Sequence, residues 1–330
     1  MTDAREIRLK SRPNGLPASD NFELVSLDLP APGPGEVQVR NTWMTVDPYM
    51  RGRMNDVKSY VPPFQLGQAL QGGAIGEVVE SNAPGFKAGD LVQSNLGWRT
   101  AFNAPADQVQ KLDVRGLPPQ AFLGVAGMPG LTAYAGLLRV AALKEGDVVF
   151  VSGAAGAVGS VVCQIAKARG HTVIGSAGGP EKCAWVKALG ADAVIDYKAE
   201  PIVPALAKAA PKGIDVYFDN VGGEHLDAAF AAARQNARFA ICGMIDDYNT
   251  GSNHAFRYIM RIIAARIMLK GFIYTDYLAE MGDFYRDMGG WIASGQVTSR
   301  ETVRDGIEAM PEAFLDLFRG ANIGKMLVRL

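Results

Sequence analysis

The stretch DVVFVSGAAGAVGS, residues 147–160, decides the fold of this 330-residue chain. Its first seven residues are an apolar run with the length and composition of a buried strand. Glycines follow at positions 153, 156 and 159, and AVGSVVCQIAKARG (157–170) has the pattern of a helix that ends in glycine. A glycine-rich turn between a strand and a helix lets the backbone approach a phosphate. The spacing is GxxGxxG rather than GxGxxG, so close packing of the strand on the helix is the alternative explanation.

The alternation of strand and helix continues after this turn. HTVIGSAG (171–178) has a strand pattern and EKCAWVKALG (181–190) a helix pattern. Four further strands and an alanine-rich helix over 224–235 are predicted, the strands in ADAVIDYK, GIDVYFDNVG, ARFAICGM and KGFIYTDY. Such alternation is typical of a parallel sheet covered by helices on both faces. We therefore predict an α/β chain with a doubly wound parallel sheet of the Rossmann type, which binds a dinucleotide.

The first 120 residues have a different pattern. Short apolar runs alternate with turns rich in glycine and proline, in FELVSLDL, EVQVRNTWMTV, GGAIGEVVES and GDLVQS. This pattern predicts a small β-rich domain of barrel or sandwich type. At the other end, residues 302–320 are predicted to form an amphipathic helix before a last strand, KMLVRL. A chain of this length usually has more than one domain.

Composition and charge exclude several classes of function. The formal net charge is −1 and no basic run occurs, so we expect no nucleic-acid partner. No stretch of eighteen apolar residues is present, so no transmembrane helix is expected. The first residues, MTDAREIRLK, lack the apolar region of a secretory signal. We expect a cytoplasmic protein without a membrane partner.

The positions of cysteine and histidine argue against a metal. The cysteines are Cys163, Cys183 and Cys242, and the first histidine is His171. The first 162 residues therefore contain neither residue type. A zinc site needs three or four clustered Cys, His or carboxylate ligands, so no zinc is expected. The cysteines are interpreted as residues without a chemical role, with Cys163 as a packing residue and Cys242 as a backbone contact. His225 and His254 are interpreted as caps or surface groups rather than bases.

The residues after the second predicted strand indicate which dinucleotide is bound. Folds that bind NAD place an acidic residue there to hold the ribose 2′-hydroxyl. Here the sequence GSAGGPEKC (175–183) has small residues at that point, followed by Lys182. A charge-assisted contact of Lys182 with a 2′-phosphate would contribute about 1.5–3 kcal/mol, or roughly ten- to a hundred-fold in affinity. NADP(H) is therefore the expected cofactor, and a solvated surface lysine is the alternative reading of Lys182.

Seven motifs in order give the chain a resemblance to a known family. They are MTVDPYMRGRM (44–54), GMPGLTAYAGL (127–137), AAGAVGS (154–160), EKCAWVKALGADAVIDYK (181–198), FDNVGGE (218–224), ICGMI (241–245) and NIGKMLV (322–328). Together they resemble the zinc-independent branch of the medium-chain dehydrogenase/reductase superfamily. Within it, the chain is similar to the leukotriene B4 12-hydroxydehydrogenase / prostaglandin reductase group, with its curcumin-reductase and alkenal double-bond reductase relatives.

The resemblance implies a domain organisation and an activity. Residues 1–124, completed by 296–330, would form a GroES-like catalytic domain, and residues 125–295 a Rossmann domain. The implied reaction is the NADPH-dependent reduction of the carbon–carbon double bond of an α,β-unsaturated ketone or aldehyde, with hydride transfer to the β-carbon. The family also implies a homodimer.

Matched motif by motif, the resemblance assigns cofactor contacts. Lys182 would hold the 2′-phosphate, and Tyr197 would lie at the adenosine end. The turn residues would lie at the pyrophosphate: Gly153, Gly156, Ala157, Val158, Gly159 and Ser160. The nicotinamide half would be surrounded by Asn220, Cys242, Gly243, Met244, Tyr248, Phe272, Ile273, Tyr274 and Asn322.

Tyrosines are the candidates for the chemistry. The reaction needs a hydrogen-bond donor at the substrate carbonyl oxygen, where charge develops, and a phenol stays protonated at neutral pH. Tyr49, which the family sets in the substrate cleft, is the first candidate; a core aromatic next to Pro48 is the alternative. Tyr248 would cap the nicotinamide side, or be a surface-loop residue. Walls built from these two tyrosines together with Phe64 and Tyr274 would suit an apolar or aromatic enone.

The proton donor stays open. The tyrosine assigned to this role in plant relatives corresponds to Ala264 here. Tyr258 could replace it only in a different helix register, and water or the cofactor's ribose hydroxyl are the other candidates. Arg51 and Arg53 are not assigned to chemistry. Two other functions remain as alternatives: an alcohol dehydrogenase or quinone reductase of the same superfamily, and an NADPH-binding protein without turnover.

Overall fold

The computed structural model describes residues 2–249 and 254–330, which cluster by their contacts into two compact units. The first unit runs to Leu123 and also contains Glu301–Asn322 and Met326–Leu330. The second unit consists of Gly124–Arg300 and Ile323–Lys325. The chain thus leaves the first unit at Gly124, returns to it at Glu301, and after that contributes only Ile323–Lys325 to the second unit. In the described part, no helix has the length and apolar character needed to cross a membrane.

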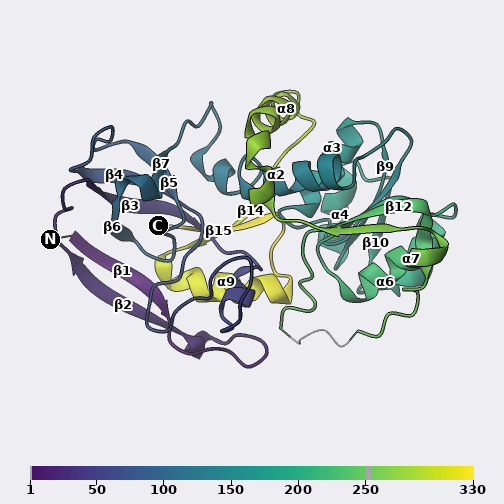
Figure 1. Cartoon of the computed structure of the whole chain (residues 1–330), viewed down its shortest axis with the longest axis horizontal. Coiled ribbons are helices and arrows are strands. Elements are labelled where there is room, and N and C mark those ends of the chain that lie inside the picture. The colour runs from purple at the N-terminus through teal and green to yellow at the C-terminus, as the bar shows by residue number, and fades with distance from the viewer. Residues whose placement is uncertain (1, 250–253) are drawn as a thin grey trace. The chain divides into compact units, whose positions relative to one another are not determined.

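The second unit is built on a parallel sheet (Figure 1). Its strands are β8 (Val148–Val151), β9 (Thr172–Ala177), β10 (Ala193–Asp196), β11 (Ile214–Asp219), β12 (Ala233–Ile241) and β13 (Met268–Gly271). Their spatial order is β10-β9-β8-β11-β12-β13, and neighbouring strands run parallel. Numbered from β8, this is the 3-2-1-4-5-6 order of the Rossmann fold. The predicted α/β fold class is confirmed.

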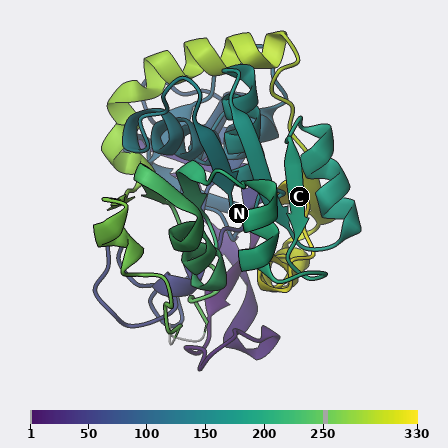
Figure 2. The same cartoon turned by 90° about the vertical axis from the view of Figure 1, so that its right-hand side faces the viewer.

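Helices connect these strands and cover both faces of the sheet. They are α2 (Met128–Ala135), which continues into the π-helix η4 (Gly136–Val140), α3 (Gly159–Ala168), α4 (Pro180–Ala188), α5 (Ile202–Ala209), α6 (Gly223–Ala232), α7 (Arg261–Ala264), the 3₁₀-helix η5 (Tyr274–Glu280) and α8 (Met281–Ala293). Figure 1 shows α3 and α6 on opposite faces of the sheet, as expected for right-handed crossovers. Figure 2 shows η5 and α8 as a long helical ribbon at the edge of this unit.

The first unit is β-rich, as predicted. Its elements are β1 (Thr2–Leu9), β2 (Phe22–Leu29), β3 (Glu36–Thr45), α1 (Met50–Arg53), β4 (Ala74–Ser81), β5 (Leu91–Ser94), β6 (Ala101–Pro105), β7 (Val109–Lys111), β14 (Glu301–Asp305), α9 (Met310–Arg319) and β15 (Lys325–Arg329). The larger sheet has the order β14-β15-β3-β4-β5-β7, with β6 also paired to β3. Trp98 centres its core, stacked on Phe22 at 5.8 Å and in edge contact with Phe314 at 6.0 Å.

Two predicted elements differ in the structure. The helix predicted over 302–320 begins only at Met310, because residues 301–305 extend the sheet as β14 and Gly306 adopts a positive φ of 82°. The strand predicted in KGFIYTDY ends at Gly271, and a 3₁₀-helix begins at Tyr274. Here the ring of Phe272 turns inward and packs edge-on against Phe218 at 6.0 Å, which takes the chain out of the sheet. In both places a tertiary contact overrides the local pattern.

Candidate functional site

Two of the predicted cofactor segments, the turn 153–160 and Asn220, follow the carboxyl ends of β8 and β11. These strands are neighbours, but the chain leaves β8 toward β9 on one side while β12 follows β11 on the other. Ligands of open α/β sheets bind at such a switch point. Ser152 and Asn220 join the two ends: the Asn220 amide Nδ2 donates to the Ser152 carbonyl at 2.7 Å, and its backbone N–H donates to Ser152 Oγ at 2.9 Å.

The glycine turn after β8 is closely folded. Gly153 has a φ of 58°, and its carbonyl accepts the N–H of Gly156 at 2.9 Å. A Cβ on Gly159, where α3 begins, would lie 2.4 Å from that carbonyl oxygen. Ala157 and Val158 are partly exposed, whereas Ser160 is buried. The turn therefore presents its backbone, directly before the start of α3, to a ligand, which fits a pyrophosphate.

Two lysines lie at the end of β9. Burial lowers the pKa of the Lys182 ammonium, and the positive charge of Lys198 lowers it further. A Cβ on Gly178 would lie 2.8 Å from the Tyr197 hydroxyl and 2.9 Å from Cε of Lys198, so both side chains lie over this glycine. The carboxylate of Asp196, at the end of β10, accepts the backbone N–H groups of Gly179 and Lys198 at 2.9 and 3.0 Å. The site has the charge to accept a 2′-phosphate.

Lys198 was missed from the sequence, although it follows Tyr197 directly in the motif ADAVIDYK. Its position next to Lys182 depends on the pairing of β9 with β10, which the motif alone does not reveal.

The structure brings together the predicted residues at the ends of β11 and β12. The carbonyl of Asp219 accepts the N–H groups of Cys242 and Gly243 at 2.9 and 3.1 Å. The N–H of Met244 donates to the Tyr248 hydroxyl oxygen at 3.3 Å. Asn220, Cys242, Gly243, Met244 and Tyr248 therefore belong to one loop cluster.

The segment Phe272–Tyr274 follows at the next strand end. The backbone N–H of Phe272 donates to the Ile241 carbonyl at 3.4 Å, but its ring packs against Phe218 and Gly136. The side chain of Phe272 therefore packs inside this unit, and only its backbone follows the strand end. Ile273 and Tyr274 are partly buried.

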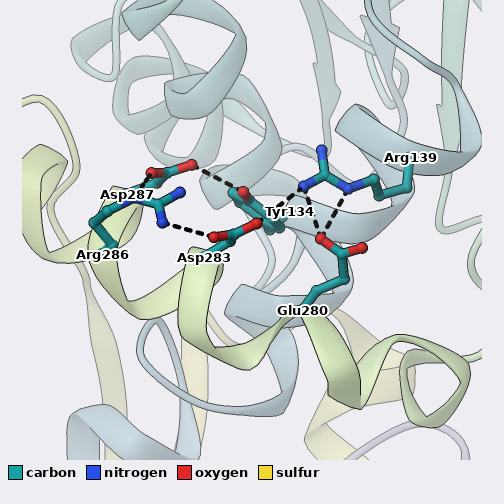
Figure 3. A network of polar contacts seen from close by, with 6 residues as sticks. All are labelled: Tyr134, Arg139, Glu280, Asp283, Arg286 and Asp287. Atoms are coloured by element: carbon teal, nitrogen blue, oxygen red, sulfur yellow. Dashed lines mark hydrogen bonds and ion pairs between the residues drawn. The ribbon is translucent and has the colours of Figure 1, made fainter.

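The helices that follow this segment are anchored by a polar network (Figure 3). The hydroxyl of Tyr134 in α2 donates to Asp287 of α8 at 2.8 Å. Arg139 of η4 pairs with Glu280 at 2.7 Å, and Arg286 bridges Asp283 and Asp287. Burial raises the pKa of Tyr134 to about 12, and the bond to Asp287 adds to this. The network holds α8 against α2.

Tyr49 and Phe64 lie in the first unit and share one neighbour. Tyr49 precedes α1 and packs against the apolar core of this unit. The guanidinium of Arg53 lies 4.0 Å from the Phe64 ring centroid. Burial lowers the pKa of Arg53, while the charge of and hydrogen bond to the Tyr49 phenol act in the opposite direction. Arg53 was left out of the sequence-based site, and the structure places it in contact with both aromatic candidates.

The remaining candidates are also placed. Asn322 belongs to the first unit, one residue before the segment Ile323–Lys325 of the second. Tyr258 lies next to α6, where its backbone N–H donates to Asp227 at 2.9 Å, and its side chain is 37% exposed. Ala264 ends α7. Within residues 2–249 and 254–330, no group of three His, Cys, Asp or Glu side chains is arranged to hold a metal ion.

Comparison with known proteins identifies the family. A family model described as the N-terminal domain of oxidoreductase matches residues 5–112, and one described as zinc-binding dehydrogenase matches residues 157–290. The NADPH-dependent curcumin reductase of Escherichia coli is 41% identical over 98% of this chain and 95% of its own. The NADP(+)-dependent 2-alkenal reductase of Nicotiana tabacum is 38% identical over 98% and 96%.

A solved structure supports the same assignment. The CurA protein of Vibrio vulnificus in complex with NADPH superimposes with a TM-score of 0.94 at 42% identity, over 98% of both chains. The chain therefore belongs to the medium-chain dehydrogenase/reductase superfamily, in the group formed by the curcumin, prostaglandin and 2-alkenal reductases.

Proposed function

We propose that this protein is an NADPH-dependent reductase of the carbon–carbon double bond of α,β-unsaturated ketones and aldehydes. The observation that carries the cofactor assignment is a pair of lysines near the strand end where NAD-binding folds place an acidic residue. Lys198 lies over Gly178, and its charge lowers the pKa of Lys182. The names of the similar reductases support the substrate class.

The chain's own residues would perform three tasks. Bound NADPH supplies the hydride. The turn from Gly153 to Ser160 would hold the pyrophosphate, and Lys182 with Tyr197 the phosphorylated adenosine. The loop cluster of Asn220 and residues 242–248, with Phe272–Tyr274 and Asn322, would surround the nicotinamide half. The side-chain packing of Phe272 supports a role for the backbone of this segment.

Tyr49 would donate a hydrogen bond to the substrate carbonyl oxygen, with Tyr248 as the second donor. The contact with Arg53 supports the first assignment, because a guanidinium that donates to a phenol oxygen polarises its O–H bond. Neither assignment identifies the residue that gives a proton to the α-carbon. Ala264, which stands at the position of the plant relatives' tyrosine, has no ionisable group and cannot do so.

The reaction would proceed without zinc. Support comes from the first 162 residues, which contain neither cysteine nor histidine. Metal analysis of purified protein tests this: less than one tenth of an equivalent of zinc is expected, and a stoichiometric amount that is lost together with activity on chelation would contradict it.

We further propose that the protein is cytoplasmic, as expected from the sequence, and that it forms a homodimer. The two copies would meet at β13. β13 is the last strand of its sheet, and its residues are exposed. Exposed apolar side chains gather near it in the sequence: Ile259, Met260, Ile263, Met268 and Leu269. A two-fold axis at this edge would pair β13 with its copy and cover these side chains. Sedimentation should give a dimer that Leu269→Lys converts to a monomer.

A spectrophotometric screen tests the proposed reaction. Consumption of NADPH is followed at 340 nm with enones and 2-alkenals, and is repeated with NADH. Turnover of unsaturated but not saturated carbonyls, at least ten times faster with NADPH at low cofactor concentration, is expected. Cofactor binding without turnover of any of them would favour a non-catalytic NADPH-binding protein.

A further inference from the structure

One carboxylate oxygen at the switch point accepts four hydrogen bonds. Oδ1 of Asp219 accepts from the hydroxyls of Ser152 at 3.0 Å and Tyr217 at 2.6 Å. It also accepts from the backbone N–H groups of Val221 and Gly222, both at 2.9 Å. We call these five residues the Asp219 cluster. Three of its residues, Asp219, Ser152 and Tyr217, are fully buried.

The Asp219 cluster fixes the turn that leaves β11. Gly222 and Gly223 have positive φ values of 78° and 48°, so the turn needs a conformation that few sequences hold unaided. Two bonds from this turn end on the Asp219 side chain, and the Asp219 carbonyl holds Cys242 and Gly243 at the end of β12. The side chain therefore holds the turn after β11. The loop after β12 is bonded to that turn, because the N–H groups of Ile245 and Asp246 donate to the carbonyls of Asn220 and Val221 at 3.3 and 3.1 Å.

The Asp219 cluster also reaches β8. Ser152 Oγ donates to Asp219 and accepts the backbone N–H of Asn220. Below it, the Tyr217 ring is stacked on Phe150 of β8 at 5.1 Å and meets Phe239 of β12 edge-on at 5.4 Å. The same three strands are thus joined by an aromatic layer and by the polar layer above it.

The second oxygen, Oδ2 of Asp219, is buried without a hydrogen-bond partner among the described residues. Burial raises the pKa of this carboxyl, while the bond from Tyr217 acts against that shift. A buried carboxylate with one unsatisfied oxygen is costly for folding. Such a cost is often found where a group is needed for function.

We propose that Asp219 is a positioning residue, which holds the loops after β11 and β12 in the arrangement that binds the nicotinamide half of the cofactor. The proposal rests on the proposed function, since it assumes that NADP(H) binds at this switch point. Asp219 touches no reacting atom in this role. It acts through the turn of Asn220, Val221 and Gly222, to which the loop after β12 is bonded.

A pair of ligands separates this role from a purely structural one. NADP⁺ and 2′-phosphoadenosine diphosphate ribose share everything except the nicotinamide ring. Their dissociation constants are measured by calorimetry for the wild type, Asp219→Asn and Tyr217→Phe. Tyr217→Phe keeps the aromatic packing and removes only the 2.6 Å bond, so it keeps the test valid if Asp219→Asn does not fold.

Tyr134→Phe is the matched control, because it also removes a buried tyrosine hydroxyl bonded to an aspartate of the same unit. Both test variants should bind NADP⁺ at least tenfold more weakly and the ring-less analogue within twofold of the wild type. Tyr134→Phe should bind both ligands like the wild type. Equal losses for the two ligands, or no loss for NADP⁺, would overturn the proposal.

The wild type distinguishes this proposal from the proposed reaction. If it binds NADP⁺ but reduces no unsaturated carbonyl, the proposed reaction fails and the comparison of ligands still decides the role of Asp219. If it binds neither ligand, both proposals fail.

Discussion

The carbonyl oxygen of Gly153 lies 2.4 Å from the position that a Cβ on Gly159 would take. Any side chain at Gly159 therefore moves the turn away from the start of α3. We expect Gly159→Ala to cost about 1–3 kcal/mol of unfolding free energy and to weaken NADPH binding at least tenfold. Gly289→Ala is the control, since it is exposed in α8 with nothing near its Cβ position. It should stabilise the protein by about 0.5–1 kcal/mol. Urea titration and calorimetry measure both, and wild-type affinity in Gly159→Ala would contradict the assignment of the turn.

Lys182→Ala should change the choice of cofactor. Loss of a charge-assisted contact to the 2′-phosphate weakens NADPH binding by roughly ten- to a hundred-fold and leaves NADH binding unchanged. Lys198→Ala should act in the same direction. Lys208→Ala, on the exposed surface of α5, is the control. Fluorescence titration measures the affinity of each variant for NADPH and for NADH. Equal weakening of the binding of both cofactors in Lys182→Ala would mean that Lys182 acts only through folding.

His225 should make stability depend on pH. Burial lowers the pKa of His225 from 6.5 to about 4, so the folded state becomes protonated only at a lower pH than the unfolded state does. The neutral imidazole therefore favours folding fully above pH 6.5, and this contribution is lost as the pH falls toward 4. The loss at pH 5 is about 2 kcal/mol. His225→Phe keeps an aromatic ring beside Tyr197, 5.0 Å away. Between pH 7.5 and 5 it should lose about 2 kcal/mol less than the wild type in urea titrations, and an identical loss would refute this.

The network in Figure 3 should contribute unevenly to stability. Tyr134 is buried, so Tyr134→Phe removes the donor to Oδ2 of Asp287 and should cost about 1–2 kcal/mol. Arg139 is 37% exposed on its side chain, and Arg139→Ala should cost less than about 1 kcal/mol. Thermal unfolding at low and high salt provides the measurement. A larger effect for Arg139, or one that vanishes in salt for Tyr134, would reverse this ranking.

Tyr49→Phe should lower kcat by about a hundredfold, the usual effect of losing one donor to a developing oxyanion. The affinity for NADPH should not change. Tyr60→Phe is the control: this phenol also acts on the pKa of Arg53, but its side chain is 63% exposed. Steady-state rates with one enone test the pair, and full activity in Tyr49→Phe would exclude it as the donor.

Local sequence patterns were sufficient to predict the segment of strand, turn and helix around Gly153. The apolar run before Gly153, the glycines and the helix after them are contiguous, and they were predicted directly. The Asp219 cluster could not be predicted, because Ser152 and Asp219 are 67 residues apart and meet only through the strand order. Tyr134 and Asp287 are separated by 153 residues. β14 was mistaken for helix because its pairing with β15 outweighs the local periodicity.

The central claim is that hydride from NADPH reaches the β-carbon of an unsaturated carbonyl compound. NADPH carrying deuterium at the transferred position of its nicotinamide is incubated with the enzyme and an enone, and the product is analysed by NMR. We predict a saturated ketone with deuterium on the β-carbon and the carbonyl group retained. Deuterium on the carbonyl carbon of an allylic alcohol would contradict this account and identify an alcohol dehydrogenase instead.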